Sequence, residues 1–167
     1  MLTLLPVMTG CITGKTPVIG IHSGELAPEI KAEGISGDTI ALSSLRGKYV
    51  LVEFWDSGND PARRSHFEMQ RVYEKYKNAS FKDGSKGYAV FSISLDAKKE
   101  QWKDAVQTDH VQWPEQAIDT RGWNAPAVVT YNVASLPKYY LIDGDGVIVY
   151  HNILIDELEE KLKEEIN

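Results

Sequence analysis

The order of apolar and polar residues along this chain predicts alternating strands and helices. Residues 49–55 and 88–95 are two runs of mostly β-branched and aromatic side chains with few polar interruptions. Continuous apolarity of this kind is typical of strands covered on both faces. Residues 139–142 and 147–150 predict two further strands. The Asp-Gly-Asp-Gly stretch at 143–146 predicts a hairpin turn between them, because both residue types tolerate positive φ.

Apolar positions three and four residues apart predict four helices. The longest extends from Pro61 to about Lys77, with Asp60 expected as its N-cap and proline at the first helical position. Shorter helices are expected over residues 98–107 and 125–131. An amphipathic helix is expected from Leu154 onward, with an apolar face made of Leu154, Leu158, Leu162 and Ile166.

The segment before residue 49 predicts an N-terminal β-hairpin. Residues 39–42 follow a turn at 36–38, and residues 43–47 resemble a single helical turn closed by glycine. Parallel crossovers followed by a terminal hairpin and helix predict an α/β domain in three layers with a mixed central sheet.

Composition narrows the classes of function. A chain of 167 residues fits one domain that needs no disulfide or metal for its stability. The net charge of −6 disfavours a nucleic-acid partner, because phosphate binding needs a basic face. The single cysteine, Cys11, excludes a disulfide within the chain, a four-cysteine zinc cluster and a dithiol redox cycle.

The sequence around Cys11 resembles the end of a bacterial lipoprotein signal peptide. A short apolar run, Leu2 to Met8, is followed by two small residues directly before the cysteine. Met8 stands where leucine is usual, and no basic residue precedes the run. The alternative is an N-terminal arm, disordered or added to a sheet edge, with an incidental thiol.

The lipoprotein interpretation divides the chain into a signal segment (1–11), a tether (12–24) and the domain (25–167). Cys11 is then the lipid attachment site of a protein in the bacterial cell envelope that faces the periplasm. Elsewhere no apolar run approaches the roughly 20 residues of a membrane-spanning helix. Contact with a membrane is therefore expected only through the lipid.

Several separated motifs carry a family resemblance from about Gly24 to the C-terminus. They are, in order, residues 24–30, 40–55, 93–96, 112–114, 122–123 and 131–143. This set resembles the TlpA-like and peroxiredoxin-related (AhpC/TSA, or redoxin) branch of the thioredoxin superfamily. The resemblance implies a thioredoxin-like α/β/α sandwich. It also implies thiol-disulfide oxidoreductase chemistry at a Cys-x-x-Cys motif directly after the strand that ends in Phe54-Trp55.

Both cysteines of that motif are replaced in this chain. The family proline falls on Pro61, the first cysteine on Asn59 and the second on Ala62. In the family, the N–H groups and dipole of a helix N-terminus stabilise the first thiolate. An amide and a methyl group supply no nucleophile for disulfide exchange or peroxide reduction. No catalytic residue is therefore assigned, and the sequence favours a protein without enzymatic activity.

Other family features remain. Glu53 matches the acid that the family buries beneath its cysteines, and we expect local hydrogen bonds or a lysine to hold it. Pro137 matches the family's cis-proline, which leaves the preceding backbone free to pair with an extended peptide. Arg63 and Arg64 are expected on a solvated helix face. The expected binding groove is lined by Trp55, Asn59, Asp60, Pro61, Leu136 and Pro137.

The remaining candidate sites are weak. The acidic stretch 143–146 lacks the third oxygen ligand and the glutamate of a calcium loop, and it is expected to be a turn. No metal and no cofactor is expected. The histidines have no ligand spacing and no carboxylate partner at helical or strand spacing; they are His22, His66, His110 and His151. The tryptophans are expected to pack in the core and loops; they are Trp55, Trp102, Trp113 and Trp123.

Three functions stay open at this point. The favoured one is a redox-inactive thioredoxin-like module of the bacterial envelope that binds an extended polypeptide or an envelope protein. The second is a thiol-disulfide oxidoreductase or a peroxidase-type antioxidant that acts through Cys11 or a partner's thiol, which lipidation of Cys11 would preclude. The third is a wholly structural domain with a vestigial site.

Overall fold

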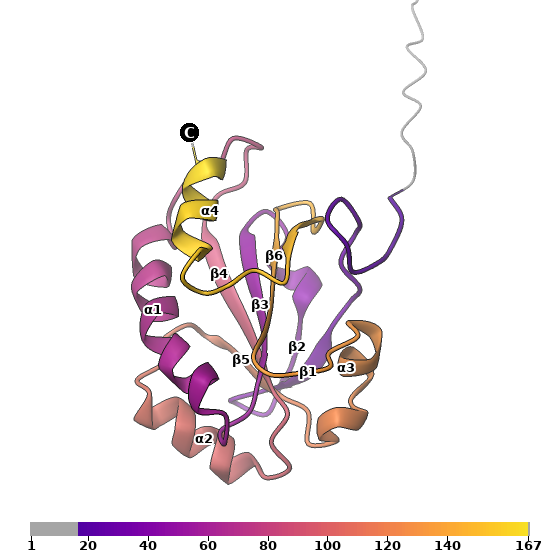
Figure 1. Cartoon of the computed structure of the whole chain (residues 1–167), viewed down its shortest axis with the longest axis vertical. Coiled ribbons are helices and arrows are strands. Elements are labelled where there is room, and N and C mark those ends of the chain that lie inside the picture. Colours follow the sequence, from indigo (N-terminus) through magenta and orange to yellow (C-terminus); the bar gives the residue numbers. More distant parts are fainter. Residues whose placement is uncertain (1–16, 167) are drawn as a thin grey trace, which may run out of the picture.

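A central β-sheet of seven strands organises the structure. The computed structural model describes residues 17–166, and its strands follow the order β2-β1-β5-β4-β3-β6-β7 across the sheet (Figure 1). β4 runs parallel to β3 and β5, whereas the other neighbouring pairs are antiparallel. The strands are β1 (Lys31–Gly34), β2 (Thr39–Ala41), β3 (Tyr49–Trp55), β4 (Tyr88–Ser94), β5 (Glu115–Ile118), β6 (Lys138–Ile142) and β7 (Ile148–His151).

Helices cover both faces of this sheet. Alternate residues of β3 point to opposite sides: Val52 packs in a cluster with Val128 of α3, and Leu51 packs with Met69 of α1. Because both faces are filled, all seven residues of β3 are buried. The helices are α1 (Asp60–Tyr76), α2 (Lys99–Thr108), α3 (Pro126–Thr130) and α4 (Leu158–Glu165), with short 3₁₀ turns η1 (Leu42–Leu45) and η2 (Gly122–Asn124).

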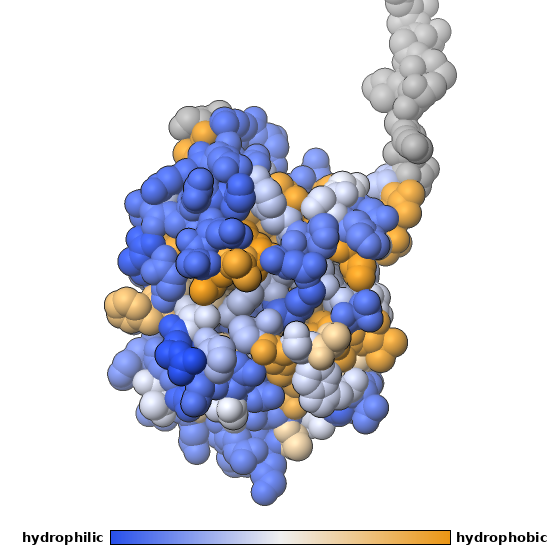
Figure 2. All heavy atoms as spheres, viewed as in Figure 1, coloured by the Kyte–Doolittle hydropathy of each residue, from blue (hydrophilic) through white to orange (hydrophobic). Residues whose placement is uncertain are grey.

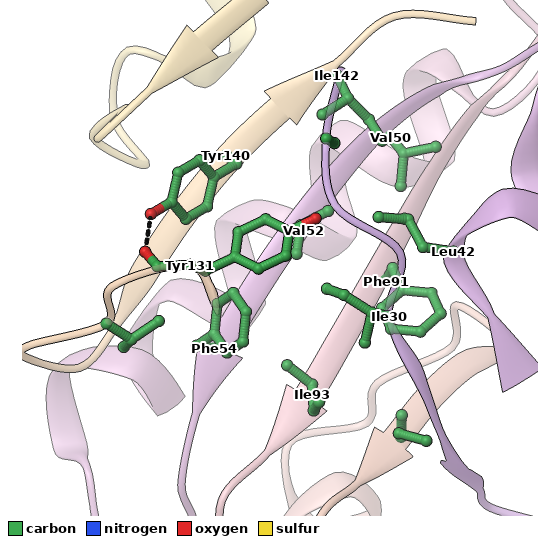
Figure 3. Close-up of a cluster of buried hydrophobic side chains, with 14 of the residues drawn as sticks. Ile30, Leu42, Val50, Val52, Phe54, Phe91, Ile93, Tyr131, Tyr140 and Ile142 are labelled. Carbon is green, nitrogen blue, oxygen red and sulfur yellow. Dashed lines mark hydrogen bonds between the residues drawn. The ribbon is translucent and has the colours of Figure 1, made fainter. Parts of the chain in front are cut away.

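Aromatic rings fill the α3 side of the sheet (Figure 3). The rings of Phe54 and Tyr131 have centroids 5.3 Å apart, and those of Tyr131 and Tyr140 are 5.1 Å apart. The Tyr140 hydroxyl donates to the Tyr131 carbonyl at 2.7 Å, and the Tyr131 hydroxyl donates to the Pro28 carbonyl at 2.6 Å. These bonds satisfy two buried hydroxyls and attach the segment that leads to Pro137 firmly to the core.

The predicted α/β sandwich with an N-terminal hairpin is confirmed, but the prediction omitted β5. Its sequence, Glu-Gln-Ala-Ile, is short and half polar, so it carries no strand signal of its own. Even so, β5 is an interior strand that pairs with both β1 and β4 and buries Gln116 and Ala117.

The predicted start of the C-terminal helix was wrong. α4 begins at Leu158, and Leu158 and Leu162 are buried as expected. Leu154 lies before the helix with 59% of its surface exposed. The regular spacing of leucines in the sequence therefore includes one residue, Leu154, that precedes the helix.

The domain also includes part of the predicted tether. The N–H of Leu26 donates to the Val18 carbonyl, and the N–H of Gly24 donates to the Ile148 carbonyl, both at 2.8 Å. Residues 18–24 are thus hydrogen-bonded to the body of the domain. The predicted signal segment, including Cys11, lies outside the described residues.

Candidate functional site

The N-terminus of α1 is capped by Asn59. This residue has an extended backbone (φ −91°, ψ 96°), and its Oδ1 accepts a hydrogen bond from the Ala62 N–H at 2.9 Å. The expected N-cap, Asp60, is instead the first residue of the helix, so that prediction was wrong. The physical reason is distance. An N-cap oxygen accepts from the backbone N–H two or three residues later, and Asn59 precedes Ala62 by three residues.

Asn59 also connects the two parts of the predicted groove, the start of α1 and the segment that contains Pro137. Its Nδ2 donates to the Leu136 carbonyl at 3.2 Å, and the peptide bond between Leu136 and Pro137 is cis. Asn59, which matches the family's first cysteine, therefore lies next to the cis-proline. Ala62 is fully buried, whereas Asp60 and Pro61 are exposed.

A pocket opens beside Pro137, displaced from the predicted groove. It measures about 680 Å³ and lies among α1, the start of β6 and the β7–α4 connection. Pro137 alone of the six predicted groove residues lines it, and Trp55 is fully buried and lines no surface. Figure 2 shows apolar residues below α4, the region of that connection. The lining residues are Ser65, Ser135, Pro137, Lys138, Tyr139, Asn152, Ile153, Leu154, Ile155 and Asp156.

Beneath the site, Glu53 is a fully buried carboxylate. Its Oε2 accepts a hydrogen bond from the Ser92 hydroxyl at 2.5 Å, and that hydroxyl accepts one from the Trp113 ring N–H at 3.1 Å. The Oε1 of Glu53 lies 3.4 Å from Nε2 of His66. The predicted local hydrogen bond is present, but the basic partner is a histidine rather than a lysine.

His66 stands between two carboxylates. Its Nδ1 lies 2.8 Å from Oδ2 of Asp109, opposite the nitrogen that faces Glu53. The ring also packs edge-on against Trp55 and Trp113, with centroid distances of 4.5 and 5.8 Å. His66 has no carboxylate partner at helical or strand spacing, as the sequence indicated, but it meets two carboxylates from more distant positions. Its partners come from β3 and from the residue after α2, and no helical or strand spacing reveals such contacts.

The pKa values of His66 and Asp109 depend on a balance between burial and the charged groups that each side chain meets. Burial disfavours the imidazolium of His66, but the attraction of Glu53, with the hydrogen bond and attraction of Asp109, outweighs it and raises the pKa of His66. Burial alone would raise the pKa of Asp109, but hydrogen bonds from Arg63 and His66 outweigh burial and lower that pKa. The two carboxyl groups therefore favour the protonated form of His66.

Arg63 completes this chain of charges at the surface. Its Nε and Nη2 both donate to the Asp109 carboxylate, at 3.0 and 2.5 Å. Arg63 is therefore a partner of a half-buried acid rather than part of a solvated face, whereas Arg64 is exposed as expected. The bidentate geometry fixes Asp109 opposite His66.

The remaining candidates from the sequence are the acidic stretch at 143–146, a metal site and the tryptophans. Oδ1 of Asp143 accepts hydrogen bonds from the N–H groups of Asp145 and Val147, so the 143–146 stretch forms the predicted turn. Within residues 17–166, no group of three or more His, Cys, Asp and Glu could hold a metal ion. Three tryptophans are buried as expected, but Trp123 is 51% exposed.

Comparison with known proteins places this site in a family. The model of the AhpC/TSA family matches residues 23–151. The chain is 31% identical over 130 residues to the thioredoxin-like protein YneN of Bacillus subtilis, covering 78% of this chain and 71% of that protein. It is 29% identical over 140 residues to the thiol-disulfide oxidoreductase ResA of Bacillus cereus, covering 84% and 74%.

A solved structure agrees with this result. The thioredoxin domain of a thiol-disulfide oxidoreductase from Bacteroides vulgatus superposes with a TM-score of 0.78 at 26% identity. The match covers 89% of this chain and all of that domain. The chain, with asparagine and alanine at the positions of the two family cysteines, belongs to the AhpC/TSA family of thioredoxin-like proteins.

Proposed function

We propose that this domain is a redox-inactive member of its family that binds an extended segment of another polypeptide beside Pro137. The observation that carries the proposal is the double role of Asn59. Its amide caps α1 and bonds to the Leu136 carbonyl, at the position where the family has its first cysteine. The scaffold of the site is thus intact while its nucleophile is replaced.

The chemistry of Asn59 supports the loss of redox activity. A neutral amide neither ionises nor forms a disulfide, and its oxygen already takes the Ala62 N–H, one of the groups that stabilise a thiolate at such a position. Ala62 offers only a methyl group. The one cysteine of the sequence, Cys11, precedes the described domain.

The pocket supports the binding role. Its volume of about 680 Å³ falls in the range of roughly 300–1,000 Å³ that is usual for ligand sites. Apolar walls with a few polar groups suit a peptide side chain. The Leu136 carbonyl has two lone pairs and Asn59 uses one, so a peptide N–H can still pair there.

The proposal places the domain in the bacterial cell envelope, attached through a lipid on Cys11. Among residues 17–166, no helix combines the length and apolarity needed to cross a bilayer. The intact mass of the protein purified from bacterial membranes tests this part. A mass that includes acyl groups on Cys11 is expected, and an unmodified thiol there would contradict it.

Two assays on the full chain and its Cys11→Ser variant test the function. We expect neither protein to reduce insulin disulfides or consume peroxide above buffer. We also expect weakly binding extended peptides to shift backbone NMR signals of residues 135–139 and 152–156. Turnover that disappears in Cys11→Ser would establish the oxidoreductase alternative. Absence of both turnover and peptide binding would leave a structural domain.

A further inference from the structure

We propose that the pocket beside Pro137 selects peptide segments in which an Asp or Glu side chain adjoins an aliphatic residue, with Lys138 binding the carboxylate. This inference rests on the proposed function and adds the chemical class of the ligand. It follows from two properties of the pocket: a cation without an acidic partner and an apolar wall.

Lys138 is a cation without an acidic partner. Within the described chain, no carboxylate oxygen lies within ion-pair distance of its ammonium, which instead donates to the neutral Oδ1 of Asn152. It also lies 5.5 Å from the centre of the Tyr140 ring. By contrast, Lys75, Lys77 and Lys99 each meet a glutamate.

The surroundings of Lys138 favour an anionic ligand. The side chain is half-buried, and burial lowers the pKa of Lys138 because it penalises the charged form. A carboxylate placed against the ammonium would relieve that penalty, and a charge-assisted hydrogen bond of this kind is stronger than a neutral one. Asn152 neutralises none of the charge.

Ser135 supplies a hydrogen-bond donor to the same pocket. Its side chain is exposed, and its hydroxyl can donate to a carboxylate that Lys138 binds. Tyr139 also lines the pocket, but its hydroxyl oxygen is buried and offers no donor to a ligand there.

Three apolar residues of the lining supply the aliphatic preference. The pocket is lined in succession by Ile153, Leu154 and Ile155. Leu154 belongs to no helix or strand, and 59% of this large apolar residue is exposed. An aliphatic ligand side chain would cover this surface. Asp156 also lines the pocket and would repel a second acid, so the expected ligand carries a single acid rather than an acidic run.

Selection from a random twelve-residue peptide library on the full-length protein tests this inference. We expect enriched peptides with one acid next to an aliphatic residue. A fluorescently labelled enriched peptide is then compared with its Glu-to-Gln counterpart. We expect the acidic peptide to bind about tenfold more tightly to the unaltered protein. With Lys138→Gln that ratio should fall to about one, because the charge that reads the acid is gone.

Lys103→Gln is the matched control, because Lys103 is an exposed lysine of α2 outside this pocket and its loss changes the net charge equally. It should keep the tenfold ratio. Peptides that bind without acid preference and lose affinity in Leu154→Ser would overturn the inference and leave the proposed function standing. Peptides that need a free C-terminal carboxylate instead of an acidic side chain would also overturn it. Failure to select any peptide would overturn both.

Discussion

Nε2 of His66 lies 3.4 Å from Oε1 of Glu53, and both side chains have 1% or less of their surface exposed. His66 belongs to α1 and Glu53 to β3, so the pair links that helix to the sheet. Asp109 holds the other ring nitrogen at 2.8 Å. The free energy of unfolding therefore depends on the protonation of His66, a buried residue next to the candidate site.

The first prediction is a loss of stability as the pH rises above about 6.5. The pKa of His66 is raised in the folded protein, so its contribution is complete below the unfolded value of about 6.5. The contribution disappears as the pH rises through the folded pKa. Urea unfolding measured from pH 5 to 9 should show the decline. His66→Gln should flatten this profile while His151→Gln, an exposed control, should not. A profile equally steep in His66→Gln would contradict the assignment.

The second prediction concerns replacement of the buried pair. His66→Leu alone leaves the Glu53 carboxylate buried without its cation and should cost about 3–5 kcal/mol of unfolding free energy. Glu53→Leu with His66→Leu should cost less than His66→Leu alone, because the apolar pair removes both charges together. Equilibrium denaturation of both singles and the double variant gives the coupling energy. Additivity within about 0.5 kcal/mol would show that the two residues act independently.

The third prediction separates Asn59 from Asp60 at the start of α1. Asn59→Ala should cost about 1 kcal/mol through loss of the cap. Asn59→Asp keeps an oxygen for the Ala62 N–H and should lose less stability, but it removes the amide donor to Leu136. NMR signals of residues 135–137 should therefore move in both variants. A larger loss of stability in Asp60→Ala than in Asn59→Ala would contradict the capping geometry.

The fourth prediction is that the redox chemistry of the family can be restored. Asn59→Cys with Ala62→Cys places two sulfurs at the N-terminus of α1, above Glu53 and beside Pro137. The first thiol should have a pKa of roughly 3.5–7.5 and reduce insulin disulfides. Asn59→Ser with Ala62→Ser is the matched control without sulfur. A double-cysteine variant that folds and forms its disulfide but reacts no faster than a free thiol would show a wider loss of function.

The sequence predicted those parts of the molecule whose signal is local. β3 and β4 are continuous apolar runs, and the turn at 143–146 has residues that suit its geometry. β5 was missed because Glu115 and Gln116 are polar, and its place in the sheet comes from pairing with β1 and β4. His66 occupies an apolar position of α1, which hinted at burial.

The contacts of the candidate site could not be predicted in the same way. The partner of His66 at Asp109 is 43 residues away, and no period in the sequence connects them. The pocket beside Pro137 depends on the course of residues 152–156, and the regular leucine spacing assigned residues 154–156 to a helix. Resemblance located Asn59 and Pro137, but only the fold shows that the Asn59 amide spans the gap between them.

The hairpin β1–β2 has a protective consequence for the whole sheet. β1 pairs with β5 through Glu33 opposite Ile118 and Gly34 opposite Ala117, so it covers what would otherwise be the open edge of the parallel strands. Unpaired N–H and C=O groups along such an edge are a template for strands of other molecules. A shortened domain that began after the hairpin would keep its candidate site but expose β5, and it would be prone to edge-to-edge aggregation.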